Sequence, residues 1–187
     1  MARTAVLLVD AQNDFFPGGA LPVPGGDAIL PAVNALLELA GTRGWPVAAS
    51  RDWHPEDHAS FSTRGGPWPV HCVRGTAGAE LHPGLALPPV FTMVHKATDR
   101  DRDAYSAFEG TGLAAALEER GIGRLLVGGL ALDYCVRATC LDAREAGFEV
   151  ALVLPATRAV EVHPGDGEAA LEALRAAGVA VLAEVPR

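Results

Sequence analysis

The sequence predicts a single α/β domain, a three-layer sandwich in which a six-stranded, mostly parallel sheet lies between helices on both faces. Three observations favour this fold. Short apolar runs recur six times along the 187 residues, a length that suits one ordinary domain with a sizeable core. Helical patterns that close on a glycine lie between several of these runs. The stretch from about residue 51 to 88 has no sustained periodicity, which is typical of a functional loop excursion.

Each predicted strand is a short apolar run bounded by polar or turn-forming residues. Runs this continuous are typical of strands that are buried on both faces of a parallel sheet. In chain order the predicted strands cover residues 5–10, 46–50, 89–94, 124–130, 149–154 and 179–185.

The predicted helices are segments with helical spacing of apolar residues. They cover residues 27–44, 111–123, 133–147 and 165–178, and so alternate with the strands. This alternation indicates a mostly parallel sheet with helices on both faces. Because no linker, repeat or low-complexity segment divides the chain, we expect one domain over residues 1–187, with residues 51–88 as a loop insertion.

Composition narrows the classes of partner. The formal net charge of −8 argues against binding to nucleic acid or to an anionic membrane surface, and favours a small soluble partner. The apolar run near the N-terminus stops at Asp10, too early for a signal peptide, and no later run approaches the length of a membrane span. We therefore expect a cytoplasmic protein. We also expect a homo-oligomer, of a size that the sequence does not specify.

Three cysteines offer a candidate nucleophile. Cys72, Cys135 and Cys140 are an odd number without a CxxC pair, which indicates free thiols rather than a disulfide framework. Cys135 falls where a predicted strand meets the next helix, at the carboxyl edge of the sheet. The helix dipole there predicts a thiol pKa below the free value of about 8.5, whereas Cys140 lies more than a turn inside the helix. The alternative is that Cys135 is a small buried hydrophobe.

Two charged residues are expected to join this cysteine. Asp10 ends the first apolar run, and Lys96 closely follows the third. The carboxyl ends of parallel strands meet at one edge of a sheet, so a carboxylate, an ammonium and a thiol can converge there. Taken singly, the aspartate could instead be a turn cap and the lysine a solvated charge.

The loop insertion carries a candidate metal site. Asp52 and His54 are two residues apart, so their side chains point to one side of an extended backbone. His58 and His71 lie on the same excursion, and an aspartate with two or three histidines suits Zn²⁺, Fe²⁺ or Mn²⁺. The alternative is that these are loop histidines that only make hydrogen bonds. Cys72, beside His71, is expected to be structural.

Five segments together resemble a known family, the nicotinamidases (pyrazinamidases) within the isochorismatase-like cysteine hydrolases. These segments occur in the family's order over most of the chain. They read LLVDAQNDFFPGGAL (7–21), SRDWHPEDHASF (50–61), WPVHCVRGTAGAELH (68–82), HKATDRDRDAYSAFEG (95–110) and GLALDYCVRATCLDA (129–143).

The resemblance implies roles for individual residues. It implies a catalytic triad of Asp10, Lys96 and Cys135, and a cis peptide between Leu130 and Ala131 that shapes an oxyanion hole. The backbone N–H groups of Ala131 and Cys135 would form that hole.

The same resemblance implies a metal site and a substrate pocket. The metal ligands would be Asp52, His54 and His71, with His58 or a water as the fourth ligand, because that position varies within the family. The pocket would be lined by Phe15, Trp68, Tyr105 and Leu130.

The implied activity is hydrolysis of nicotinamide to nicotinate and ammonia through a cysteine thioester, extending to pyrazinamide. The implied cofactor is one divalent metal ion that orients the pyridine ring. Zinc is the expected ion, and iron or manganese are the alternatives. Another small-amide hydrolase of the superfamily, acting for example on carbamoyl compounds, is the alternative, and such relatives lack the metal cluster. A non-catalytic Rossmann-like binding module is a second alternative, but no GxGxxG follows the first strand and no Walker P-loop is present.

Overall fold

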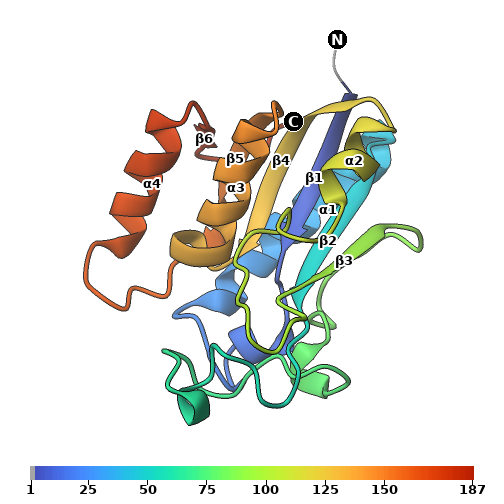
Figure 1. Cartoon of the computed structure of the whole chain (residues 1–187). Helices are drawn as coiled ribbons and strands as arrows, with labels where there is room; N and C mark the ends of the chain where they lie inside the picture. Colours follow the sequence, from blue (N-terminus) through green and yellow to red (C-terminus); the bar gives the residue numbers. More distant parts are fainter. Residues whose placement is uncertain (1–2) are drawn as a thin grey trace.

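The computed structural model describes residues 3–187, so the first two residues of the predicted domain lie outside the described part. All six strands form one parallel sheet with the order β3-β2-β1-β4-β5-β6 (Figure 1). Its strands are β1 (Arg3–Val9), β2 (Val47–Asp52), β3 (Thr92–Lys96), β4 (Ile122–Leu130), β5 (Glu149–Arg158) and β6 (Ala180–Leu182). The predicted six-stranded parallel sheet is confirmed.

Helices cover both faces of the sheet, as predicted. The helix α1 (Leu30–Arg43) packs on one face, and α2 (Leu113–Glu118), α3 (Arg137–Glu145) and α4 (Asp166–Ala176) pack on the other (Figure 1). Successive residues of β1 face opposite layers, because side chains alternate along a strand. Val6 contributes to the core beneath α1, whereas Leu7 contributes to the core beneath the other three helices.

Some element boundaries differ from the prediction, for local physical reasons. The third strand starts only at Thr92, after prolines that cannot donate to a sheet ladder. The strand β5 continues beyond Pro155 through a register irregularity and still pairs Arg158 with Leu130. The edge strand β6 is shorter than predicted, at three residues.

The order of the strands places the functional region. The chain starts in the middle of the sheet, moves outward to β3, and returns to lay β4 against β1. Ligands of such sheets bind at the carboxyl ends of the strands, where this reversal leaves a crevice. Gly129 makes the close approach possible, because a Cβ there would lie 1.9 Å from the carbonyl oxygen of Val9.

The long connection between β2 and β3 lies at this same end of the sheet (Figure 1). It runs from Trp53 to Phe91, and its regular structure is limited to isolated β-bridges and short 3₁₀ turns at Ser62–Arg64 and Ala77–Ala79. The predicted loop excursion of residues 51–88 therefore exists, with its first two residues still in β2. Over residues 3–187, none of the helices combines the length and the apolar character needed to cross a membrane.

Candidate active site

Cys135 lies on a turn that directly follows β4. The peptide between Leu130 and Ala131 is cis, as predicted, and residues Leu132–Val136 then form a single π-helical turn before α3 begins. The amide of Val136 donates to the carbonyl of Ala131 at 3.0 Å, which closes this turn. π turns are rare and occur often at functional sites. The turn places Cys135 at the bottom of a pocket with 6% of its surface exposed.

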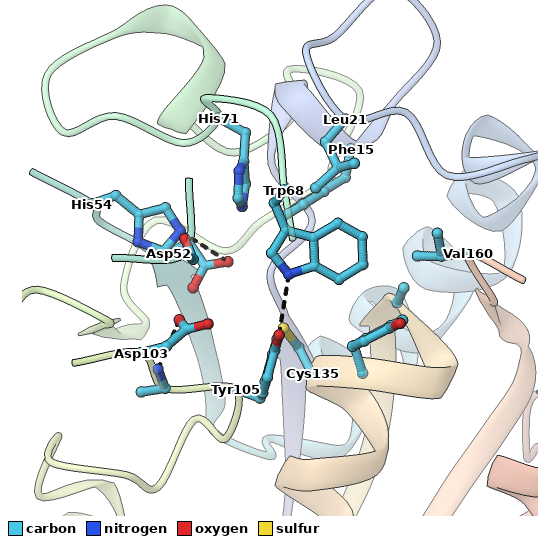
Figure 2. Close-up of a pocket in the computed structure, with 14 residues that line it drawn as sticks. Phe15, Leu21, Asp52, His54, Trp68, His71, Asp103, Tyr105, Cys135 and Val160 are labelled. Atoms are coloured by element: carbon cyan, nitrogen blue, oxygen red, sulfur yellow. Dashed lines mark hydrogen bonds and ion pairs between the residues drawn. The ribbon is translucent and has the colours of Figure 1, made fainter. Parts of the chain in front are cut away.

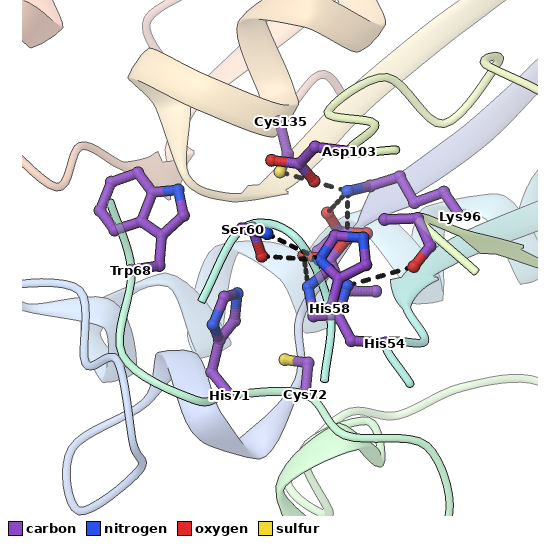
Figure 3. A network of polar contacts seen from close by, with 12 residues as sticks. His54, His58, Ser60, Trp68, His71, Cys72, Lys96, Asp103 and Cys135 are labelled. Atoms are coloured by element: carbon purple, nitrogen blue, oxygen red, sulfur yellow. Dashed lines mark hydrogen bonds and ion pairs between the residues drawn. The ribbon is translucent and has the colours of Figure 1, made fainter. Parts of the chain in front are cut away.

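Lys96 joins this cysteine to two carboxylates. Its Nζ lies 3.4 Å from Cys135 Sγ, 3.0 Å from Asp10 Oδ2 and 2.5 Å from Asp52 Oδ1, and it also donates to the carbonyl of Ala104 (Figure 3). These residues follow or end β1, β2, β3 and β4. The structure therefore brings Asp10, Lys96 and Cys135 together, as predicted from their positions at the ends of the strands.

The charges of this buried group depend on one another. Burial raises the pKa of Asp10 to about 6, although the ammonium of Lys96 opposes the shift. Burial would also raise the pKa of Asp52, but the ammonium of Lys96, which also hydrogen-bonds this carboxylate, outweighs burial and lowers that pKa. Burial would lower the pKa of Lys96, but the two carboxylates outweigh it and raise the pKa, so the lysine stays charged.

The expectation of a lowered thiol pKa is wrong. Burial raises the pKa of Cys135 well above its usual value, against the opposing charge of Lys96, and the carboxylates of Asp10 and Asp52 raise it further. Desolvation and two nearby negative charges outweigh the dipole of the following helix. The thiol is therefore protonated at rest and needs a base.

The carboxylate of Asp10 lies close to the thiol. Its Oδ1 accepts a hydrogen bond from the hydroxyl of Ser50 at 2.7 Å, which fixes the carboxylate. Its Oδ2 is buried and accepts no hydrogen bond from residues 3–187, although it lies at ion-pair distance from Lys96. Asp10, Asp52 and Cys135 each place a polar atom within 4.8 Å of the others. The free oxygen of Asp10 can thus receive the thiol proton.

Three of the predicted metal ligands converge beside this group. Asp52, His54 and His71 each offer one ligand atom within 4.8 Å of the others, and all three are buried. The carboxylate of Asp52 faces both sides, because Oδ1 contacts Lys96 while Oδ2 lies 3.8 Å from His54 Nε2. Figure 3 shows His54 and His71 on the side of the network away from Cys135.

The histidine tautomers suit a metal ion. His54 Nδ1 lies 3.2 Å from the carbonyl of Ala97, and His71 Nδ1 lies 2.8 Å from the carbonyl of Pro69. A carbonyl only accepts, so each Nδ1 carries the hydrogen and each Nε2 presents a lone pair. Burial lowers the pKa of His54 to about 4, which keeps its ring neutral. Its Nε2 is buried without a hydrogen-bond partner among the described residues, as expected for an atom that binds a metal.

His58 lies next to this cluster but is engaged elsewhere. Its ring stacks on His54 with centroids 4.2 Å apart. Its Nε2 lies 3.1 Å from the carbonyl of Arg102 and its Nδ1 lies 2.7 Å from the hydroxyl of Ser60. Both ring nitrogens therefore have partners, and the structure does not bring His58 into the ligand group. His58 instead packs against one face of the His54 ring.

Cys72 has a structural environment. It is fully buried, and its backbone amide donates to the carboxylate of Asp14 at 2.7 Å. Its carbonyl accepts the amide of His54, which ties the two strands of the loop together. Burial raises the pKa of its thiol well above the usual value. These contacts agree with the expectation that Cys72 is not a ligand.

A pocket opens over the cysteine and the metal cluster (Figure 2). Phe15, Trp68 and Tyr105 line it as predicted, and the indole N–H of Trp68 donates to the hydroxyl of Tyr105 at 3.1 Å. Leu130 does not line it, because its side chain is fully buried in the core beneath α1. The other lining residues are Leu21, Asp52, His54, Ser60, His71, Asp103, Ala104, Ala131, Tyr134, Cys135 and Val160.

Several of these pocket residues were missed from the sequence. Tyr134 could have been predicted to line the pocket, since it directly precedes Cys135 and its aromatic ring can pack beside a bound substrate. Val160 follows β5 without any motif, so no local pattern marks it. Gln12 was also missed, and its side chain hydrogen-bonds both the backbone amide and the carbonyl of Asp52, at 2.8 Å each. Hydrogen bonds of this kind join segments that are distant in the sequence, so no periodic pattern in the sequence predicts them.

Comparisons with known proteins agree with this geometry. The isochorismatase domain matches residues 4–184. The nicotinamidase of Escherichia coli is 39% identical, over 95% of this chain and 93% of its own length. The pyrazinamidase of Pyrococcus horikoshii, solved in complex with zinc, has a TM-score of 0.92 and 48% identity, covering 96% of this chain and 98% of that chain. PnC1 from L. infantum, solved in complex with nicotinate, has a TM-score of 0.90 and 41% identity, covering 97% and 92%.

These matches span nearly the whole chain and do not depend on one motif. The family segments identified from the sequence all fall within the matched residues 4–184. The fold, the buried cysteine group and the adjacent ligand cluster lie where those segments place them. The chain therefore belongs to the isochorismatase family and, within it, to the nicotinamidases.

Proposed function

We propose that this protein hydrolyses nicotinamide to nicotinate and ammonia through a thioester on Cys135. The observation that carries the proposal is a single pocket with two walls of different chemistry. One wall presents Cys135, with Lys96 and Asp10 buried behind it, and the other presents the ligand cluster of Asp52 and two histidines. The nicotinate bound by PnC1 from L. infantum supports the choice of substrate.

In the first half of the reaction, Asp10 takes the thiol proton while the sulfur of Cys135 attacks the carboxamide carbon. The carbonyl oxygen gains a negative charge, which the backbone N–H groups of Ala131 and Cys135 stabilise. One such donor is typically worth about 3–4 kcal/mol in the transition state. Asp10 then gives its proton to the amide nitrogen, and ammonia leaves as the C–N bond breaks.

In the second half, water hydrolyses the thioester. Asp10 is again unprotonated and accepts a proton from the attacking water, so the new C–O bond forms as the C–S bond breaks. The departing sulfur lies 3.4 Å from Lys96 Nζ, whose charge stabilises the thiolate until it regains a proton. Nicotinate is released and the resting thiol is restored.

The ligand cluster fits a divalent first-row metal ion. One carboxylate oxygen and two neutral imidazole nitrogens are donors that zinc binds readily, and iron or manganese would also suit them. We propose zinc, held by Asp52, His54 and His71, in keeping with the zinc complex of the Pyrococcus horikoshii protein. When bound, such an ion offers a position for the pyridine nitrogen, which fixes the ring with its carboxamide over Cys135. Pyrazinamide has a ring nitrogen in the same relation to its carboxamide, so we propose it as a second substrate.

Discrimination between nicotinamide and benzamide tests this function. Benzamide has nearly the same shape but lacks the ring nitrogen. The metal-loaded enzyme is expected to hydrolyse nicotinamide with a kcat/KM about 10⁴-fold higher, since a site built for a polar group strongly rejects the analogue that lacks it. Chelation, or His54→Ala, should shrink this ratio, because each removes the group that distinguishes the rings. His163→Ala, at an exposed histidine before α4, is the matched control.

Equal kcat/KM values for the two amides in the metal-loaded enzyme would overturn recognition of the ring nitrogen. Ammonia release from a panel of small amides, including carbamoyl compounds, separates the proposal from its closest alternative. A chain that released ammonia only from carbamoyl compounds would belong with that alternative, although the ligand cluster argues against it.

The pH dependence of thiol alkylation tests the role of Asp10. In the metal-free wild type the thiol proton passes to Asp10, so the alkylation rate of Cys135 should reach a plateau once Asp10 is unprotonated, above about pH 6. In Asp10→Asn the proton must go to water. The rate should then rise about tenfold per pH unit through the neutral range. Parallel pH profiles for the two proteins would remove Asp10 from the reaction.

We further propose a cytoplasmic location and self-association. The three cysteines are buried free thiols, in keeping with a reducing compartment. Cell fractionation checks the first proposal. Light scattering of the purified protein checks the second, because a monomeric mass at micromolar concentration would exclude a stable oligomer.

A further inference from the structure

One wall of the substrate pocket is formed by Val160, which lies outside the five segments that resemble the nicotinamidases. Val160 lies two residues beyond the end of β5 and lines the pocket together with Cys135 and Trp68. Figure 2 shows it across the pocket from His54 and Asp52. The ring of a bound substrate would therefore lie between the ligand cluster and this valine.

The backbone at Val160 is held by the turn that carries the nucleophile. Asp133, two residues before Cys135, accepts the amide of Val160 with one carboxylate oxygen and the amide of Glu161 with the other, both at 2.9 Å. Hydrogen bonds to a carboxylate are among the stronger ones in proteins. The turn that carries Cys135 and the pocket wall at Val160 are therefore joined directly by two hydrogen bonds.

A second carboxylate fixes the same segment to α4. The backbone of Glu161 has a positive φ of 57°, a conformation that residues other than glycine rarely adopt. Its carboxylate accepts the amides of Gly165 and Gly167, at 2.8 and 2.9 Å, at the start of that helix. A Cβ at Gly167 would lie 2.5 Å from Glu161 Oε1, so the glycine leaves the room that this carboxylate fills.

We propose that Val160 is a specificity-determining residue that limits the size of substituents on the substrate ring, and that Asp133 is the positioning residue that holds it there. This inference rests on the proposed function. With the ring nitrogen toward the ligand cluster and the carboxamide on C3 toward Cys135, the opposite edge of the ring, carbons C4 and C5, faces Val160. Of these two carbons, C5 is the one that is not next to the carboxamide. Because the segment is tied to two elements, the valine cannot withdraw from a larger ring.

A series of nicotinamides with hydrogen, methyl, ethyl or propyl at ring carbon C5 tests the proposal. For the wild type, kcat/KM should fall as the substituent grows. In Val160→Ala the ratio of kcat/KM for the ethyl compound to that for nicotinamide should rise about tenfold, the usual effect of one to two methylene groups in an apolar pocket. Asp133→Asn should raise the same ratio by a smaller factor. Glu168→Gln, at an exposed residue of the first turn of α4, is the control and should leave the ratio unchanged.

The ratio separates positioning from general damage. A variant that merely weakens the fold, or misplaces Cys135, lowers kcat/KM for all four compounds by one common factor and leaves the ratio fixed. A fixed ratio in Val160→Ala overturns the specificity role, and a fixed ratio in Asp133→Asn alone overturns the positioning role. If the wild type did not hydrolyse nicotinamide at all, the proposed function would fail instead, which is a distinguishable result.

Discussion

Cys135→Ala is expected to lower the turnover of nicotinamide by about 10⁵- to 10⁶-fold, because removal of a nucleophile abolishes the covalent path. The fold should remain intact. The side chain is small, it lies at the base of a pocket, and its loss leaves the backbone bonds of the π turn in place. Ammonia release under steady-state conditions measures the effect, and circular dichroism checks the fold.

The other two cysteines supply the controls for this experiment. Cys72→Ala and Cys140→Ala should each keep most of the activity, since neither thiol reaches the pocket. Burial raises the pKa of Cys140 to about 12, in keeping with an inert core thiol. Substantial turnover in Cys135→Ala would end the covalent mechanism.

Lys96→Met is expected to cost both stability and activity. Lys96 is 1% exposed and is the one cation in contact with Asp10 and Asp52 among the hydrogen bonds and ion pairs of residues 3–187. Breaking a buried charge pair by removing one partner typically costs about 3–5 kcal/mol. In a domain of this size we expect the melting temperature of the metal-free protein to fall by about 10 °C. Turnover should fall with it, because the thiolate loses its stabilising charge.

The loss of stability in Lys96→Met should depend on pH. The charge of Lys96 lowers the pKa of both Asp10 and Asp52, so without it burial should raise the already elevated pKa of Asp10 further and should raise that of Asp52 from its lowered value. A carboxyl whose pKa is higher in the folded than in the unfolded state stabilises the fold while it is protonated. That contribution to the free energy of unfolding is lost as the pH rises through the folded-state pKa. The variant should therefore be destabilised more at pH 8 than at pH 5.

A surface pair gives the matched control for this variant. Arg124→Met removes the partner of Glu149 at 3.1 Å, but both side chains are partly exposed. Such pairs are typically worth less than about 1 kcal/mol. Thermal unfolding at the two pH values compares the variants. Equal melting temperatures for Lys96→Met and Arg124→Met would show that Lys96 does not stabilise the buried carboxylates.

The sequence allowed the placement of those residues that stand at ends of strands. Asp10, Lys96 and Cys135 could be assigned to one edge of the sheet because the parallel order was readable from the apolar runs. Asp52 and His54 could be paired by their spacing alone. These predictions needed only the direction of each strand and the alternation of side chains along it.

Other features depended on surroundings that the sequence does not display. The pKa of Cys135 is set by burial and by carboxylates from other strands, so a rule for helix termini gave the wrong sign. Both ring nitrogens of His58 have hydrogen-bond partners, Ser60 and the carbonyl of Arg102, whereas Nε2 of His54 has none among the described residues. The wall at Val160 depends on a contact with Asp133, 27 positions away. Each is decided by tertiary contacts without periodicity.

The central position of β1 in the sheet has a consequence for how the protein becomes active as it folds. The first three strands, with the residue that follows β1, supply Asp10, Asp52 and Lys96, whereas Cys135 reaches them only through the pairing of β4 with β1. That pairing joins Ala5 to Leu125, across most of the chain, and contacts of such long range form slowly because a large loop must close first. Recovery of catalysis during refolding therefore follows the closure of this one pair of strands, and a partly folded chain that lacks it has a charged but inert site.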